Sequence, residues 1–366
     1  MDITGKITGI KYDILLSEEL GEIDINEFNI NKAPSAFLLK DDKNLFAVST
    51  WVSPKRTRSY PFERVYNTLK LSKKITVIPI VKDEGKNGDR DYIQWDTVSL
   101  MSLLDVFVIV AFYDKAIAHS TDNKKITEQQ FNNDYIISKI KEIEKYHSSA
   151  LHWNLNELNE NLPDVIDKVK TSYEKIEKET GVQLHSIKGL DDFKIRIGKD
   201  VSHFMEFSRE KSENAQRRES VTVQPKESLS TDSKAKITIE NYLGGKYYFT
   251  VDETFLSGQK LDLIERKHSA TALLPSKSDI KDGLLKMILY SNLSDVTVNG
   301  KKIKSEAVLC LTSPHICGEM TSSSSDKDIE VFLQENEFSL SQKQLIKTVT
   351  KEANQNKFII QIKFSK

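Results

Sequence analysis

The amino-acid sequence predicts an α/β protein built from two domains. With 366 residues, the chain is longer than a single hydrophobic core usually supports. Short β-branched and aromatic runs fill its first third, a helical repeat follows, and a polar stretch without aromatic residues then precedes a second series of strands and a helix. We therefore expect an N-terminal α+β domain over residues 1–207, a linker or exposed loop over 208–235, and a second domain over 236–366.

The composition is that of a folded protein. Its overall charge, close to zero, does not favour binding to a polyanion. Hydrophobic residues make up 38% of the chain, and 53 Lys and Arg balance 54 Asp and Glu. Binding to nucleic acid would therefore depend on local basic clusters. Cys310 and Cys317 fit neither a zinc half-site nor a disulfide framework, and the first residues show no signal peptide, so we expect a cytoplasmic protein. The most apolar stretch, Ser99–Tyr113, contains Asp105 and is too short to span a bilayer, which indicates buried core and no membrane partner.

The elements of the N-terminal domain follow from its apolar patterns. The runs "SAFLLKDD", "NLFAVSTWV" and "KKITVIPIVKDEG" predict strands that end in polar or glycine-containing turns. Between residues 127 and 180 the apolar spacing becomes helical, with an interruption at Pro163 and a helix that restarts at Asp164 and ends at Gly181. The apolar positions of the first helical repeat are Phe131, Tyr135, Ile136, Ile140 and Ile143. Within the core segment, Asp105 has to be paired, capped or functional.

A proline-flanked basic loop in the same domain is a candidate DNA contact. Lys55, Arg56 and Arg58 lie between two prolines, with aromatic residues beside them. Arginine contacts phosphates and pairs bidentately with guanine in the major groove. We predict that these three side chains bind DNA, and an ordinary exposed loop is the alternative interpretation.

The second domain is expected to contain strands in "KITIENYL", "KYYFTVDETFL", "KLDLIERKHS", "EAVLCLTS" and "NKFIIQIKF". The segment "SDIKDGLLKMILYSNL" predicts a helix with Ser278 as its N-cap and with Asp279 and Asp282 compensating the helix dipole. An apolar stripe would pack this helix on the sheet, and Lys281 and Lys286 would face the backbone of a bound DNA. The stripe comprises Ile280, Leu284, Met287 and Ile288.

The residues that carry chemistry end the strand "KLDLIERKHS". Side chains two residues apart share one face of a strand, so Glu265 and Lys267 are neighbours and Arg266 points to the opposite face. A hairpin turn at "SGQ" would bring Asp252 beside Glu265, while Glu253, of opposite parity, competes for the same role. Carboxylates are the hard oxygen ligands that Mg²⁺ requires, and an ammonium group can hold a phosphate or assist an attacking water.

This arrangement resembles the PD-(D/E)XK nuclease superfamily, in which an acid precedes Glu-x-Lys at the end of a strand. Val251 stands where the superfamily has a proline, which leaves the choice between Asp252 and Glu253 open. The longer segment from Tyr247 to Leu293, with a helix after the Glu-x-Lys strand, looks like the catalytic segment of a group of bacterial type II restriction endonucleases.

The resemblance implies a mixed sheet flanked by helices and a Mg²⁺-dependent, sequence-specific cleavage of double-stranded DNA. In that case Asp252 and Glu265 would hold the metal and Lys267 would orient the phosphate and the water. Lys55, Arg56, Arg58 and Lys281 would contact DNA. A homodimer would place one active site on each strand of a palindromic site, and a companion DNA methyltransferase would protect the host.

Three other interpretations fit the same residues. Glu265, Arg266 and Lys267 can be a solvated strand end without chemistry. The protein can also be a DNA-binding regulator whose nuclease-like domain is inert, or a repair nuclease that recognises DNA structure.

Overall fold

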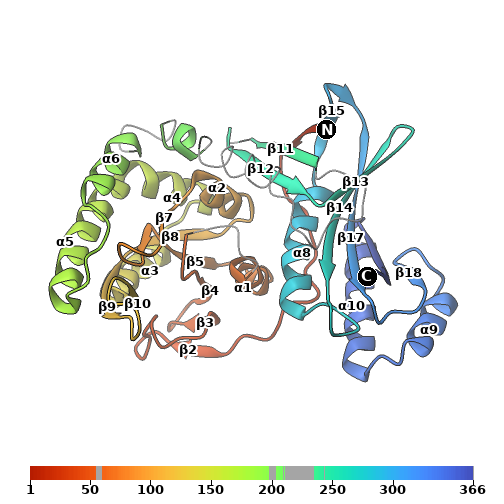
Figure 1. The fold of residues 1–366 in the computed structure, drawn as a ribbon, viewed down its shortest axis with the longest axis horizontal. Helices are drawn as coiled ribbons and strands as arrows, with labels where there is room; N and C mark the ends of the chain where they lie inside the picture. Colours follow the sequence, from red (N-terminus) through yellow and green to blue (C-terminus); the bar gives the residue numbers. More distant parts are fainter. Residues whose placement is uncertain (55–59, 198–202, 209, 211–234, 243, 366) are drawn as a thin grey trace. The chain divides into compact units, whose positions relative to one another are not determined.

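The computed structural model describes residues 1–54, 60–197, 203–208, 210, 235–242 and 244–365, and the chain forms two compact units that mix helices and strands (Figure 1). The N-terminal unit is Glu19–Ser208, and the C-terminal unit combines Met1–Glu18 with Arg209–Lys366. The first 18 residues therefore belong to the C-terminal unit, in contrast to the expected boundary. The reason is that strand β1 (Asp2–Ile7) pairs with β11 (Ala235–Asn241), far away in sequence.

The N-terminal unit is organised around a mixed sheet with the strand order β2-β3-β4-β5-β8. Strands β3 and β4 are antiparallel and the other neighbours are parallel. The apolar runs expected to form strands do so, and β5 is buried along its whole length. The strands of this sheet are β2 (Glu22–Asp24), β3 (Ala36–Lys40), β4 (Leu45–Thr50), β5 (Lys74–Pro79) and β8 (Phe107–Ala111).

Two hairpins and several helices complete this unit. The hairpins are β6 (Val81–Asp83) with β7 (Arg90–Tyr92) and β9 (Tyr113–Ala118) with β10 (Ile126–Phe131). The helices are α1 (Tyr60–Thr68), α2 (Trp95–Leu103), α3 (Asn133–Glu144), α4 (Ala150–Asn156), the π-helical turn η1 (Glu157–Asn161), α5 (Leu162–Thr180) and α6 (Lys188–Ile197). As predicted, α5 ends at Gly181, whose positive φ of 69° is the left-handed conformation that ends helices.

Two sequence expectations for this unit need correction. Phe131 ends strand β10, because the helix begins only after Asn132, whose side chain caps it by accepting a hydrogen bond from Tyr135 N at 2.9 Å. Asp105 is not buried with the rest of the apolar segment, although it is paired, which was one of the expected alternatives. It forms the turn between α2 and β8 at a positive φ of 54°, and its side chain is 62% exposed and forms an ion pair with Lys74 Nζ at 3.8 Å.

The C-terminal unit contains two sheets. One has the order β12-β11-β1-β15-β16, and the other, which holds the predicted site, has the order β13-β14-β17-β19-β18. In the second sheet β14 is an internal strand, antiparallel to β13 and parallel to β17. The strands are β12 (Lys246–Val251), β13 (Glu253–Ser257), β14 (Lys260–His268), β15 (Ser294–Val298), β16 (Lys301–Lys302), β17 (Lys304–Ser313), β18 (Glu319–Thr321) and β19 (Ile359–Phe364).

Helix α8 (Lys277–Ser291) packs on β14 and β17, while α9 (Asp326–Glu335) contacts β18 and α10 (Leu340–Asn356) contacts β19 (Figure 1). The apolar stripe predicted for α8 is buried, as expected. Its N-cap is Ser276 and not Ser278, because the Ser276 hydroxyl accepts the hydrogen bond from Asp279 N at 3.1 Å. Among the described residues, no helix is long and apolar enough to cross a bilayer.

Candidate functional site

The candidate site begins with the hairpin of β13 and β14. These strands are joined at Gly258 and Gln259, and Gly258 has the positive φ of 60° that the first central residue of a type II′ turn requires. The turn sets the register in which Glu253 lies opposite Ile264, so the residue before β13 comes to the level of Glu265. The predicted hairpin is therefore present and brings the two halves of the motif together.

The side chains of β14 alternate between a buried and a more exposed face, as the sequence pattern predicts. Leu261, Leu263 and Glu265 are buried in turn, with Glu265 only 1% exposed, and Lys267 continues the same face. The backbone of this strand is hydrogen-bonded on both sides, by β13 and β17. A carboxylate at such a position has lost its water and needs compensating partners.

The hairpin also distinguishes Asp252 from Glu253. Asp252 Oδ2 accepts a hydrogen bond from the backbone N of Arg266 at 2.9 Å, and its carboxylate interacts electrostatically with Glu265 and Lys267. Glu253 instead pairs with the Arg266 guanidinium at 2.5 Å on the opposite face. The structure thus places Asp252, and not Glu253, beside Glu265 and Lys267.

Helix α8 contributes two further charges. Asp282 pairs with Lys267, and Lys286 donates a hydrogen bond to Glu265 Oε1 at 2.7 Å. The helix approaches closely at Gly283, where a Cβ atom would lie 2.6 Å from Leu309 Cδ1 and 3.4 Å from Lys267 Cε. Asp282 was expected only to compensate the helix dipole and Lys286 to face DNA, yet both pair with residues of β14.

The sequence contained a signal for the polar residues of α8 that face the strand. Asp282, Lys286 and Tyr290 are four residues apart, so they share one face of the helix. Polar side chains beside an apolar stripe on a packed helix indicate a polar partner on the sheet. In the structure that partner is the face of β14 that carries Glu265 and Lys267.

The four charges form a connected ionic network. Glu265 Oε1 lies 2.9 Å from Lys267 Nζ and 2.7 Å from Lys286 Nζ. Burial acts to raise the pKa of Glu265, but the two ammonium groups outweigh it and hold the pKa below its usual value. Burial likewise acts to lower the pKa of Lys267, but Glu265 and Asp282 raise it above the usual lysine value. Glu265 is therefore a carboxylate and Lys267 an ammonium at neutral pH.

Asp252 is in a different electrostatic state. Burial, together with the negative charge of Glu265, raises the pKa of Asp252 to about 6. Tyr290 adds a buried hydroxyl with no hydrogen-bond partner in the described part of the chain, and burial followed by the Glu265 charge raises its pKa well above 10.0. The three carboxylates of Asp252, Glu265 and Asp282 outnumber the two ammonium groups of Lys267 and Lys286 by one.

Asp252 and Glu265 fit a divalent cation, because they offer carboxylate oxygens at one place. Glu265 Oε2 is buried and has no hydrogen-bond partner among the described residues, and Asp252 supplies a second carboxylate nearby. Mg²⁺ commonly binds through one or two carboxylates and completes its shell with water and phosphate oxygens. Asp252 and Glu265 are the two carboxylates that such a site could use, and no group of three or more His, Cys, Asp or Glu side chains suited to a metal occurs in the described segments.

The residues predicted to contact DNA have different outcomes. Lys55, Arg56 and Arg58 lie outside the described residues. Lys281 is fully buried and pairs with Glu18 at 2.8 Å, because the N-terminal segment covers this side of α8. Lys281 therefore does not offer the expected phosphate contact.

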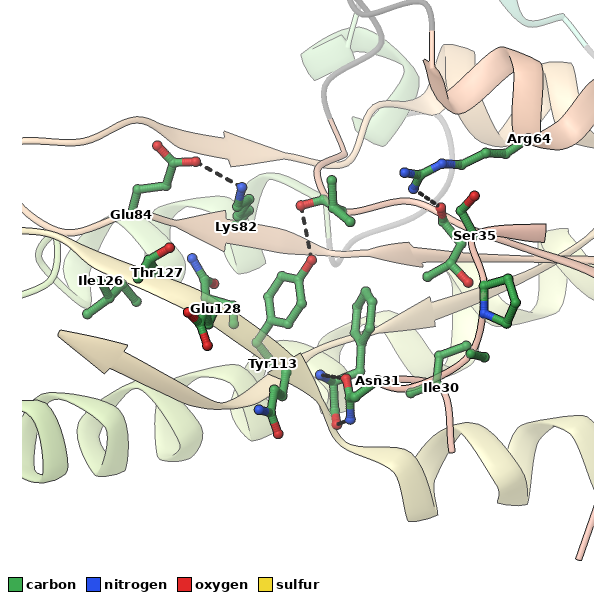
Figure 2. A pocket seen from close by; sticks show the side chains of 17 residues that line it. Ile30, Asn31, Ser35, Arg64, Lys82, Glu84, Tyr113, Ile126, Thr127 and Glu128 are labelled. Atoms are coloured by element: carbon green, nitrogen blue, oxygen red, sulfur yellow. Dashed lines mark hydrogen bonds and ion pairs between the residues drawn. The ribbon is translucent and has the colours of Figure 1, made fainter. Parts of the chain in front are cut away.

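The N-terminal unit contains a separate hollow of about 580 Å³ between β10 and residues 30–35 (Figure 2). Arg64 lies at one end of the view, and Lys82 and Glu84, paired at 2.9 Å, lie at the other. Thr50 Oγ1 and Gln129 Oε1 line it as buried polar atoms without a hydrogen-bond partner among the described residues. The lining carries both signs of charge, and we assign it no ligand.

Comparisons with protein-family models, curated proteins and solved structures find no match, so a function has to be inferred from the geometry of the site itself.

Proposed function

We propose that the protein is a Mg²⁺-dependent endonuclease that hydrolyses phosphodiester bonds of double-stranded DNA. The observation that carries this proposal is the buried Glu265 carboxylate, which faces Asp252 and Lys267 near the carboxyl end of an internal strand. A merely structural ion pair at this depth tends to be no more stabilising than apolar side chains of similar volume. A free buried oxygen on that carboxylate is a further cost that a bound cation would remove.

Asp252 and Glu265 would hold the metal ion in this proposal. When bound, Mg²⁺ polarises a phosphate and lowers the pKa of the attacking water. The raised pKa of Asp252 supports a ligand role, because the charges of Lys286 and Lys267 do not offset burial and the Glu265 charge, so that a further cation would stabilise this carboxylate. The hydrogen bond from Arg266 N orients Oδ2 and leaves Oδ1 for the metal.

Lys267 would act as a fixed cation for the scissile phosphate. Its raised pKa, caused by Glu265 and Asp282, makes it a poor proton acceptor, so the proposal gives it phosphate binding and not general-base catalysis. Asp282 is then a positioning residue, since it holds the Lys267 ammonium without reaching substrate itself.

Within this function, we propose the specific class of a type II restriction endonuclease with a PD-(D/E)XK-like C-terminal unit. An antiparallel hairpin, two further parallel strands and a helix packed over the Glu-x-Lys strand support it, together with the motif itself. In this proposal the N-terminal unit reads the DNA sequence, the enzyme acts as a homodimer, and a companion methyltransferase protects the host DNA.

A second candidate function is a DNA-binding regulator with an inert nuclease-like unit. The observation that favours it is the pairing of both Lys267 and Lys286 with a single oxygen of Glu265, which neutralises that carboxylate without a metal. This candidate predicts DNA retention without cleavage.

The deciding experiment is incubation of the purified protein with phage DNA and Mg²⁺. The wild-type protein should produce a discrete set of fragments, and Lys267→Ala and Glu265→Gln should lose at least about 100-fold of the rate, as expected when a group that stabilises the transition state is removed. Lys260→Ala is the matched control, because Lys260 is an exposed lysine at the other end of the same strand, and it should cleave normally. DNA binding without cleavage under Mg²⁺ or Mn²⁺ would support the inert regulator.

A further inference from the structure

Lys286 is the residue of α8 that pairs with the buried carboxylate of the candidate site. It reaches from α8 to the buried Glu265 and donates to Oε1 at 2.7 Å, while its own side chain is 22% exposed. Lys267 forms ion pairs with both Glu265 and Asp282. For Lys286, Glu265 is the only ion-pair partner found in the described part of the chain. This ion pair is therefore with a carboxylate of the proposed metal site, and the charge of Lys286 also acts on Asp252 and Asp282.

The same ammonium acts on both carboxylates. After the effect of burial, Lys286 exerts the largest charge effect on Glu265, and it exerts the largest positive-charge effect on Asp252. Burial acts to lower the pKa of Lys286, but Glu265 and Asp252 outweigh it and raise the pKa above the usual lysine value. Lys286, an ammonium in its ordinary state at neutral pH, thus lies beside both carboxylates of the proposed metal site.

We propose that Lys286 is a resident cation of the two-carboxylate site, which competes with a divalent metal ion and has to move aside when the metal binds. This inference rests on the proposed function, since it concerns the same carboxylates. Two positive charges a few ångströms apart in a poorly hydrated site repel strongly, and a lysine stem is flexible enough to swing away. The partial exposure of Lys286 provides the route to solvent.

The competition would also explain how Glu265 can be buried before metal arrives. An ammonium group compensates the carboxylate in the metal-free protein, which avoids the cost of an unpaired buried charge. The metal ion then takes the place of the Lys286 ammonium beside the carboxylates. The affinity of the site for divalent metal is consequently lower than its two carboxylates alone would give, so cleavage would require metal at a concentration that depends on Lys286.

The test is direct binding of Mn²⁺ to the full-length protein, followed by the loss of the free Mn²⁺ signal in electron paramagnetic resonance. Lys286→Met removes the charge and keeps most of the stem, and it should bind Mn²⁺ at least about tenfold more tightly than the wild type. Lys286→Arg keeps the charge and should remain weak. Lys277→Met makes the same change at an exposed position of the same helix and should match the wild type. Glu265→Gln identifies the portion of Mn²⁺ binding that belongs to this site.

The outcomes separate the inference from the proposed function. Binding that depends on Glu265 but is equal or weaker in Lys286→Met overturns the competition and leaves the metal site standing. Absence of Glu265-dependent binding in both proteins overturns the metal site and the inference with it.

If Lys286→Met does not fold, as judged by circular dichroism, the wild-type protein decides the question. In a sample with ¹⁵N-labelled lysine, Mg²⁺ should shift or broaden the Nζ signal of Lys286, assigned by its loss in Lys286→Arg. A Lys286 signal that stays unchanged while Mg²⁺ binds would overturn the proposal.

Discussion

Replacing Asp252 by Asn should make the protein more stable at neutral and basic pH. The amide keeps an oxygen that can accept the hydrogen bond from Arg266 N, but it removes a buried negative charge that faces Glu265. If Asp252 holds the metal ion as proposed, its carboxylate is kept against its electrostatic preference, and the change would exchange function for stability.

The magnitude follows from the pKa of Asp252. Burial and the Glu265 charge raise this pKa from an ordinary value of 3.8 to about 6. Each unit corresponds to about 1.4 kcal/mol, so the charged form costs the folded state up to about 3 kcal/mol. We expect Asp252→Asn to raise the free energy of unfolding at pH 8 by about 2–3 kcal/mol, or the midpoint of thermal unfolding by about 4–10 °C.

The sign of the pH dependence gives a second check. Because the folded-state pKa lies above the unfolded value, the contribution of Asp252 to stability is fully present below about pH 4 and is lost as the pH rises through about 6. The advantage of the Asn variant should therefore be small near pH 4 and reach its full size by pH 7 to 8.

Urea unfolding monitored by circular dichroism, repeated from pH 4 to pH 8, measures both effects. Asp326→Asn is the control, since Asp326 is an exposed residue of the same unit, and it should change stability by no more than about 0.5 kcal/mol. Adding Mg²⁺ should stabilise the wild type and have less effect on Asp252→Asn. A variant that is equally or less stable than the wild type at pH 8 would refute the electrostatic account of the site.

Three further predictions concern packing and domain structure. Gly283→Ala should destabilise the C-terminal unit by about 1–3 kcal/mol in urea unfolding, because its Cβ would lie 2.6 Å from Leu309 Cδ1 and α8 would have to shift; a stabilised variant would contradict the close approach. Lys139→Met should cost the N-terminal unit about 3–5 kcal/mol, since it leaves Glu157, only 3% exposed, without the ammonium group 2.9 Å away, and the double variant with Glu157→Met should recover much of that loss. Deleting residues 1–18 should prevent folding of the C-terminal unit, because β1 lies inside its sheet, whereas residues 19–208 expressed alone should give the circular dichroism of a folded α+β protein.

The sequence by itself determined most of the local structure. The alternation in "KLDLIERKHS" predicted which side chains of β14 face together, and the glycine-containing turn predicted the hairpin. Both depend on backbone geometry within a short segment, which the period of the apolar residues reports directly. Phe131 shows where this reasoning fails, because an apolar residue at helical spacing also fits the last position of a strand that precedes the helix.

Only the tertiary structure decided which elements meet. The periodicity of α8 shows that Asp282 and Lys286 share a face, but only the packing of the helix on β14 and β17 shows that this face meets Glu265 and Lys267. Likewise, nothing near Lys281 in sequence indicates that it pairs with Glu18. The physical reason is that local patterns are set by the few rotations of a short segment, whereas ionic contacts between distant segments are set by how their surfaces fit together.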